Sequence, residues 1–219
     1  MPVLFPFLAI AFPAVAAFLF LDSAAGRLYG RWPAWLADPA AHVTDVGRSW
    51  WILTLAALVI AGGWALRRFV ASERTGLVAA RLMSMAFYIL TSVGLAALLV
   101  NVVKRIVGRP RPVEFADYGL FSFHPLTWNF DFESFPSGHS TVNGALFMAL
   151  ALLFPRFRRP LLVLGFYFAL TRVFVGAHFP SDVMTGFGFG MWFSFATAII
   201  FSRFGVLFDG GAGRPMPKA

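Results

Sequence analysis

Residues 82–103 read LMSMAFYILTSVGLAALLVNVV, a run of 22 residues without a charged side chain. A helix needs about 20 consecutive apolar residues to cross a bilayer, because each residue adds only about 1.5 Å along the axis. Five other apolar runs reach or approach that length: Val3–Leu21, Trp51–Leu66, Ser140–Phe154, Pro160–Val175 and Val183–Phe201. The sequence therefore predicts an all-α bundle of six transmembrane helices.

The composition supports this class. Hydrophobic residues make up 59% of the chain, charged residues 13%, and the mean hydropathy is +0.74, more apolar than one soluble core requires. The stretch around Ala14-Val15-Ala16 is similar to a signal-peptide cleavage site, but no Lys or Arg precedes it and the apolar run continues to Leu21. We therefore expect a retained first helix, and a single domain over residues 1–219.

The basic residues predict the orientation. With the N-terminus in the cytoplasm, the inner segments carry a net charge of +8, the formal charge of the whole chain, as Lys and Arg beside spanning helices resist translocation. The basic residues of these inner segments are Arg67, Arg68, Arg74, Arg81, Arg156, Arg158, Arg159, Arg203, Arg214 and Lys218, and their acidic residues are Glu73 and Asp209. We expect a multi-pass inner-membrane protein with both termini cytoplasmic. This distribution argues against nucleic-acid binding, which would need a basic face with interleaved aromatic residues.

Two longer segments fall on the outer side. Residues 22–50 mix tryptophans with charged residues, which suits either an amphipathic segment in the headgroup layer or a plain connector. Residues 113–135 are rich in aromatic residues and include Asp131 and Glu133, which could order this loop by pairing with nearby arginines. We expect a polar and aromatic loop of this length over a membrane protein to cover a site.

Polar clusters stand at the ends of three apolar runs, and helix parity places all of them on the outer side. Residues 104–112 (KRIVGRPRP) offer Lys104, Arg105, Arg109 and Arg111, of which arginine matches two phosphate oxygens at once. A basic patch that only fixed topology would belong on the cytoplasmic side. Phosphate binding is therefore the better interpretation, although Arg105 and Arg109 could equally contact a lipid headgroup or lie in solvent.

The second cluster, Pro136-Ser137-Gly138-His139, leads into an expected helix. A helix N-terminus presents free N–H groups and the positive end of the helix dipole to an anion. An ordinary helix cap at Ser140 or Thr141 would explain the turn but not the histidine beside it.

The third cluster, residues 172–182 (RVFVGAHFPSD), places His178 four residues before Asp182. That spacing lets the carboxylate orient one ring nitrogen and leave the other free to attack. The simpler interpretation is an interfacial histidine beside a helix-capping aspartate, which leaves Arg172 at the end of an apolar run without a role. His42 and His124 have no anion-binding turn beside them, and we expect both at the surface.

The order and spacing of Lys104…Arg111-Pro112, Pro136-Ser137-Gly138-His139 and Arg172…His178…Asp182 resemble the three-part signature of the type 2 phosphatidic acid phosphatase (PAP2) superfamily. One position departs from the pattern: Thr171 replaces the usual serine, with its hydroxyl retained. The superfamily includes membrane lipid phosphatases and soluble vanadium haloperoxidases.

The resemblance implies a metal-free lipid phosphatase without a cofactor, acting on the periplasmic face. His178 would attack phosphorus to give a phosphohistidine, Asp182 would orient it, and His139 would protonate the leaving oxygen. The phosphate oxygens would be held by Lys104, Arg111, Ser137, Gly138 and Arg172.

The substrate and the final acceptor stay open at this point. The candidate lipids are undecaprenyl diphosphate, phosphatidylglycerol phosphate, phosphatidic acid and the phosphates of lipid A. A phosphotransferase would pass the phosphoryl group to another lipid instead of to water. A transporter or lipid-binding protein would not need His139, His178 and Asp182, and a haloperoxidase would need vanadate in a less apolar chain. The sequence does not indicate an oligomeric state.

Overall fold

The computed structural model describes residues 4–69, 72–209 and 216–217; Val3, Arg214 and Lys218, used above, lie outside them. Helices are found at all six predicted positions: α1 (Leu4–Phe20), α4 (Ser49–Phe69), α5 (Glu73–Val107), α7 (Gly138–Leu153), α8 (Arg158–Phe174) and α9 (Pro180–Arg203). The all-α prediction is confirmed. The described strands form one short pair, β1 (Phe208–Asp209) with β2 (Met216–Pro217).

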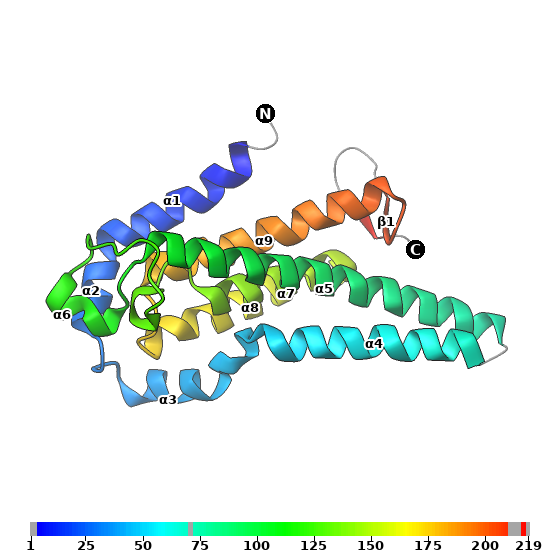
Figure 1. Cartoon of the computed structure of the whole chain (residues 1–219), viewed down its shortest axis with the longest axis horizontal. Helices are drawn as coiled ribbons and strands as arrows, with labels where there is room; N and C mark the ends of the chain where they lie inside the picture. The colour runs from blue at the N-terminus through cyan, green and yellow to red at the C-terminus, as the bar shows by residue number, and fades with distance from the viewer. Residues whose placement is uncertain (1–3, 70–71, 210–215, 218–219) are drawn as a thin grey trace.

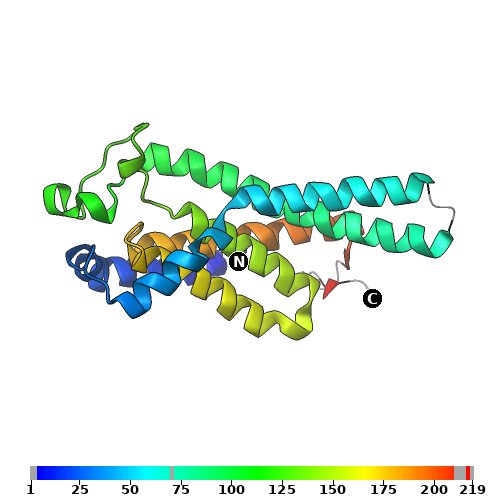
Figure 2. The ribbon, with the colours of Figure 1, turned by 90° about the horizontal axis from the view of Figure 1, so that it is seen from below.

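Length and hydropathy qualify the count of six spans. Among the described residues, the segments of α4, α5 and α9 are long and apolar enough to cross a membrane, whereas the apolar helices α1 and α7 are shorter. α5 has 35 residues, or about 52 Å. It begins nine residues before the apolar run, so the helix also includes the charged residues Glu73, Arg74 and Arg81. The far ends of α4 and α5 project beyond the rest of the bundle (Figures 1 and 2).

α7 is the central helix, packed against α5, α8 and α9 with nearly all of its side chains buried. It crosses α9 at very short range, since a Cβ atom on Gly190 would overlap the carbonyl oxygen of Thr141, and one on Gly144 that of Phe187. Small residues such as Ala96 and Ala145 fill the interior beside α5. This close crossing fixes the start of α7 against the start of α9.

Shorter elements surround one end of the bundle. They are α2 (Asp22–Arg27), α3 (Ala34–Val43) and the 3-10 turn η1 (Thr44–Gly47) before α4, then η2 (Pro112–Glu114), α6 (Phe115–Tyr118) and η3 (Phe130–Phe132) after α5; η4 (Pro155–Phe157) lies at the opposite end, between α7 and α8. The basic residues of the predicted cytoplasmic side that are described lie away from this end, where α4, α7 and α9 finish and α5 and α8 begin.

Candidate active site

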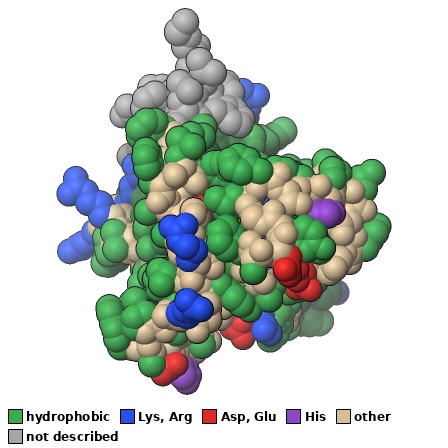
Figure 3. Space-filling model, turned by 90° about the vertical axis from the view of Figure 1, so that its left-hand side faces the viewer, with side chains coloured by type: hydrophobic (Ala, Val, Ile, Leu, Met, Phe, Trp, Pro, Cys, Tyr) green, Lys and Arg blue, Asp and Glu red, His purple; other side chains and the backbone are tan. Residues whose placement is uncertain are grey.

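The three polar clusters meet at the end of the bundle that carries α2 and α6 (Figure 1). The backbone N–H of Ser137 donates to the carbonyl of Asp182 (3.1 Å), and Arg111 donates to the carbonyl of Ala177 (3.1 Å). Direct bonds therefore join the clusters, as helix parity predicted. Seen on that end, the surface is largely hydrophobic with scattered basic, acidic and histidine side chains (Figure 3), the mixture expected at the level of lipid headgroups.

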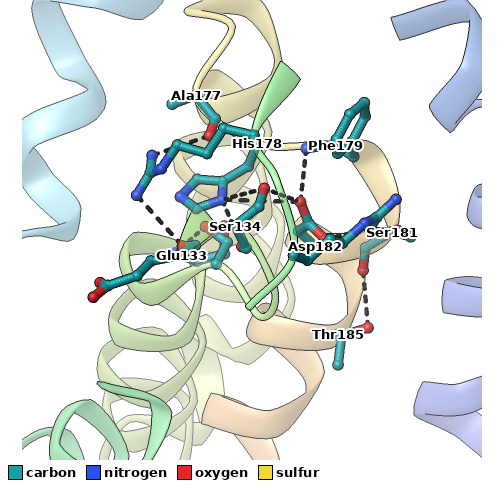
Figure 4. A network of polar contacts seen from close by, with 12 residues as sticks. Glu133, Ser134, Ala177, His178, Phe179, Ser181, Asp182 and Thr185 are labelled. Carbon is teal, nitrogen blue, oxygen red and sulfur yellow. Dashed lines mark hydrogen bonds and ion pairs between the residues drawn. The ribbon is translucent and has the colours of Figure 1, made fainter. Parts of the chain in front are cut away.

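His178 lies in the turn between α8 and α9 and is only 3% exposed. Its Nδ1 atom lies 2.8 Å from the carbonyl oxygen of Ser134 (Figure 4). A carbonyl can only accept, so Nδ1 carries the proton and Nε2 keeps its lone pair. Burial, together with the nearby charges of Arg111 and Arg172, holds the pKa of His178 well below its ordinary value. The ring is thus neutral and correctly protonated for attack through Nε2.

Asp182 does not bond directly to this ring, contrary to the simplest interpretation of the spacing. Its Oδ2 atom is 4.0 Å from His178 Nδ1 and instead accepts from Ser134 Oγ (2.6 Å) and from the N–H of Phe179 (2.9 Å). The carboxylate caps the first turn of α9, which draws it away from the imidazole. Ser134 contacts both groups and links them (Figure 4).

Arg109 completes a buried ionic cluster that sequence reasoning missed. Its side chain is 3% exposed and pairs with Asp182 and, at 2.8 Å, with Asp22 on α2. Asp22 is fully buried and also accepts from the N–H of Ser181 (2.9 Å). The alternative that Arg109 lies in solvent is wrong, because its side chain is buried. A carboxylate directly after an apolar run was the available signal, because buried charges need partners.

Glu133 holds the first cluster in place. It pairs with Lys104 (2.8 Å) and Arg105 (3.2 Å), as suggested for this loop, whereas Asp131 contributes its backbone carbonyl to the N–H of Arg111. Burial alone would raise the pKa of Glu133, but its bonds to Lys104 and Arg105 and their charges outweigh that effect and lower the pKa. The cationic side of the site is thereby anchored to loop 113–135.

Arg111 and Arg172 approach His178 from two different elements. Arg111 is fixed by a bond from Nε to the carbonyl of Phe130 (2.9 Å) and lies over that residue's ring. Arg172 donates from Nη1 to Thr44 Oγ1 (2.8 Å) in η1, while its buried Nε has no partner among the described residues. Thr171 also contacts Thr44 (3.1 Å). Segment 22–50 therefore forms one wall of the site.

The second cluster begins α7 as predicted. Ser137, and not Ser140 or Thr141, caps the helix: its hydroxyl oxygen accepts from the backbone N–H of Ser140 (3.4 Å) and also from the Ser140 hydroxyl (2.9 Å). Gly138 and His139, in the first turn, line a cavity of about 240 Å³ together with Lys104. In the described part of the chain, no three His, Cys, Asp or Glu side chains gather as metal ligands.

The two remaining histidines have exposed side chains. His42 bonds to the carbonyl of Asp38 (2.7 Å), and His124 contacts Ser122 Oγ (3.1 Å) with its ring packed against Phe132. Both belong to exposed segments, in agreement with the sequence.

Comparison with known proteins gives the class. Residues 85–205, which include both site histidines and the lysine and arginine side chains beside them, match the PAP2 superfamily. The lipid A 1-phosphatase of Rhizobium etli is 43% identical over 176 residues, covering 80% of this chain and 76% of that protein. Phosphatidylglycerophosphatase B of Bacillus subtilis is 30% identical over 72% of this chain and 71% of that protein.

The fold agrees. A crystal structure of a transmembrane PAP2-type phosphatidylglycerolphosphate phosphatase from Bacillus subtilis matches with a TM-score of 0.63 and 24% identity, over 91% of this chain and 96% of that one. The chain belongs to the PAP2 superfamily, and the predicted class, a membrane lipid phosphatase, is confirmed.

Proposed function

We propose that this protein removes the 1-phosphate from a lipid A-type glycolipid at the outer face of the bacterial inner membrane. The relatives named lipid A 1-phosphatase are 43% and 44% identical over at least 71% of their length. The undecaprenyl-diphosphatase BcrC of Bacillus subtilis is 35% identical over only 42% of this chain. This difference in identity and coverage supports a lipid A-type glycolipid over the other substrates that the motifs left open. The predicted six spans, both termini cytoplasmic, belong to the same proposal.

The observation that carries the chemistry is the neutral His178, with Nε2 free, beside the cationic groups of the first and third clusters. In the first step, Nε2 forms a bond to phosphorus while the bond to the lipid oxygen breaks, and His139 gives its proton to that oxygen. In the second step, His139 takes a proton from water, which attacks the phosphohistidine and releases inorganic phosphate and neutral His178.

Charge stabilisation comes from the chain's own cations. Lys104, Arg111, Arg172 and the N–H of Gly138 surround the position of the equatorial phosphate oxygens, whereas the N–H of Ser137 is already bonded to the carbonyl of Asp182. Phosphoryl transfer depends mainly on positioning and electrostatic stabilisation. Asp182, through Ser134, and Arg109 hold the surroundings of His178. These roles involve no metal or cofactor.

The test is phosphate release from the four candidate lipids in detergent, with and without EDTA, using His178→Ala as the control. We expect the glycolipid to be dephosphorylated fastest, EDTA to have no effect and the variant to be inactive. Faster release from another lipid would reject the proposed substrate. Product that appears as a newly phosphorylated acceptor lipid, with no inorganic phosphate, would identify a phosphotransferase.

A further inference from the structure

The cavity beside His139 has a wall that the three motifs do not account for. Besides Lys104, Gly138 and His139, it is lined by η1 and the first turn of α4, with Arg48 and Trp50, and by the last turns of α5, with Asn101. Arg48 and Trp50 are 52% and 64% exposed. The mouth of the cavity thus lies where two membrane-length helices leave the site.

The reaction geometry determines what occupies this cavity. In an in-line displacement the leaving oxygen departs opposite the attacking nitrogen. The proposed acid His139 lines the cavity, whereas the proposed nucleophile His178 does not. The group attached to the leaving oxygen therefore lies in the cavity, on the α4 side, and not behind His178.

The size and lining of the cavity match one polar ring. At about 240 Å³ it is below the roughly 300–1,000 Å³ of most ligand pockets, so it holds the group next to the phosphate and not a whole lipid. Its surface combines the Arg48 cation and the Asn101 amide with apolar Val100 and Trp50. A sugar ring likewise combines polar hydroxyl groups with an apolar C–H face. The acyl chains of the lipid would continue along α4 and α5 into the bilayer.

Arg48 is held in place for such a contact. Its Nε atom pairs with Asp45 (2.9 Å), and its two Nη groups make no hydrogen bond or ion pair within the described part of the chain. The turn before it cannot move away freely: a Cβ atom on Gly47 would come within 2.9 Å of both the His139 side chain and its carbonyl, and Thr44 bonds to Arg172. The η1 wall that carries Arg48 is therefore held in a fixed position relative to the proposed acid His139.

We propose that this cavity binds the sugar ring that carries the scissile phosphate, with Arg48 donating hydrogen bonds to its oxygen atoms and Trp50 packing on its C–H face. This inference rests on the proposed function and extends it to a binding site for the leaving group. Arg48 and Trp50 then determine specificity without taking part in the chemistry.

The test compares Arg48→Ala, Arg48→Lys and Trp50→Ala with two matched controls, Arg31→Ala and Trp35→Ala, which change exposed residues of the same outer segment outside the cavity. We expect Arg48→Ala to lower kcat/KM for the glycolipid by about 10- to 100-fold, as for a lost hydrogen bond from a charged group, mainly through KM. Lysine should restore part of the loss, and phosphatidic acid turnover should change little. An equal loss on both lipids, or none, would overturn the proposal.

A second measurement separates this inference from the proposed substrate. Glucosamine 1-phosphate, glycerol 3-phosphate and inorganic phosphate are compared as inhibitors of whichever lipid is hydrolysed fastest. We expect the sugar phosphate to inhibit best, and Arg48→Ala to remove its advantage over glycerol 3-phosphate. If the wild-type enzyme leaves the glycolipid intact but this preference holds, only the proposed substrate fails. If the sugar phosphate has no advantage, the sugar site fails whichever lipid is turned over.

Discussion

The Asp182 carboxylate lies 4.0 Å from Nδ1 of His178, while the Ser134 carbonyl oxygen lies 2.8 Å from the same nitrogen. The aspartate thus acts on the histidine through Ser134, whose hydroxyl donates to Asp182 at 2.6 Å. Ser134, two residues before the second cluster, thus supports the proposed nucleophile. This arrangement leads to the first prediction.

Ser134→Ala removes the hydroxyl but keeps the carbonyl that accepts from His178. We expect kcat to fall by about tenfold or more with little change in KM, because a hydrogen bond to a charged group is lost, and Ser134→Thr to recover most of it. Steady-state kinetics check this, with Ser122→Ala in the same loop as the control. A change confined to KM would instead assign Ser134 to substrate binding.

Arg109→Met leaves Asp22 and Asp182 buried without their cation. Breaking a buried ion pair in this way typically costs about 3–5 kcal/mol, so we expect a clear fall in the thermal unfolding midpoint in detergent. The double variant Asp22→Asn/Arg109→Met should regain part of that loss, since one uncompensated carboxylate is removed. Arg31→Ala should leave the midpoint nearly unchanged. Equal stability of Arg109→Met and wild type would contradict the ionic cluster.

Arg111→Ala and Arg172→Ala should each nearly abolish turnover. Removal of one donor to a developing anion costs about 3–4 kcal/mol. Arg172→Lys should recover little, because a single ammonium cannot replace both the bond to Thr44 and the bonds to phosphate oxygens. Phosphate release under saturating substrate measures this. Substantial activity in either alanine variant would remove that arginine from the site.

The lowered pKa of His178 has two consequences for pH. His178 stays neutral below its ordinary pKa of 6.5, so the acidic limb of the activity profile should lie below that value. An acidic limb at or above pH 6.5 in the rate of phosphate release would contradict a neutral His178 as the nucleophile.

The same pKa affects stability. Below the ordinary value of 6.5 the unfolded chain binds a proton at His178 that the folded chain does not. The free energy of unfolding should therefore fall as pH drops, by at most about 1.4 kcal/mol per pH unit. Thermal unfolding at several pH values checks this, and the His178→Asn variant should show a shallower dependence. An unchanged slope in that variant would rule out His178 as its source.

Gly190→Ala should separate α7 from α9, because the added Cβ overlaps the Thr141 carbonyl. We expect loss of both stability and activity, as the second and third clusters no longer meet. Gly62→Ala on α4, where a Cβ meets nothing within 4 Å, should be neutral or slightly stabilising. Unfolding midpoints and phosphate release measure both. Full activity in Gly190→Ala would show that the crossing tolerates more separation.

The sequence by itself determined the helices and predicted correctly that the polar clusters share one end of the bundle. Apolar runs have a length set by the bilayer, so α7 and α8 were placed within two residues, and helix parity brought Lys104, His139 and His178 to one end. Hydropathy missed the charged first turns of α5, since helical structure does not stop where apolar side chains do.

Only the tertiary structure decided how these groups are held. Sequence spacing suggested that Asp182 orients His178, but the carboxylate is used by Arg109, Ser134 and the cap of α9. Asp22 is 160 residues from Asp182 in the sequence, and no local pattern connects the two. Buried charges are matched by whichever partners the packing brings within reach. The close crossing of α7 and α9 and the wall formed by residues 22–50 therefore decided both the support of the nucleophile and the shape of the cavity beside His139.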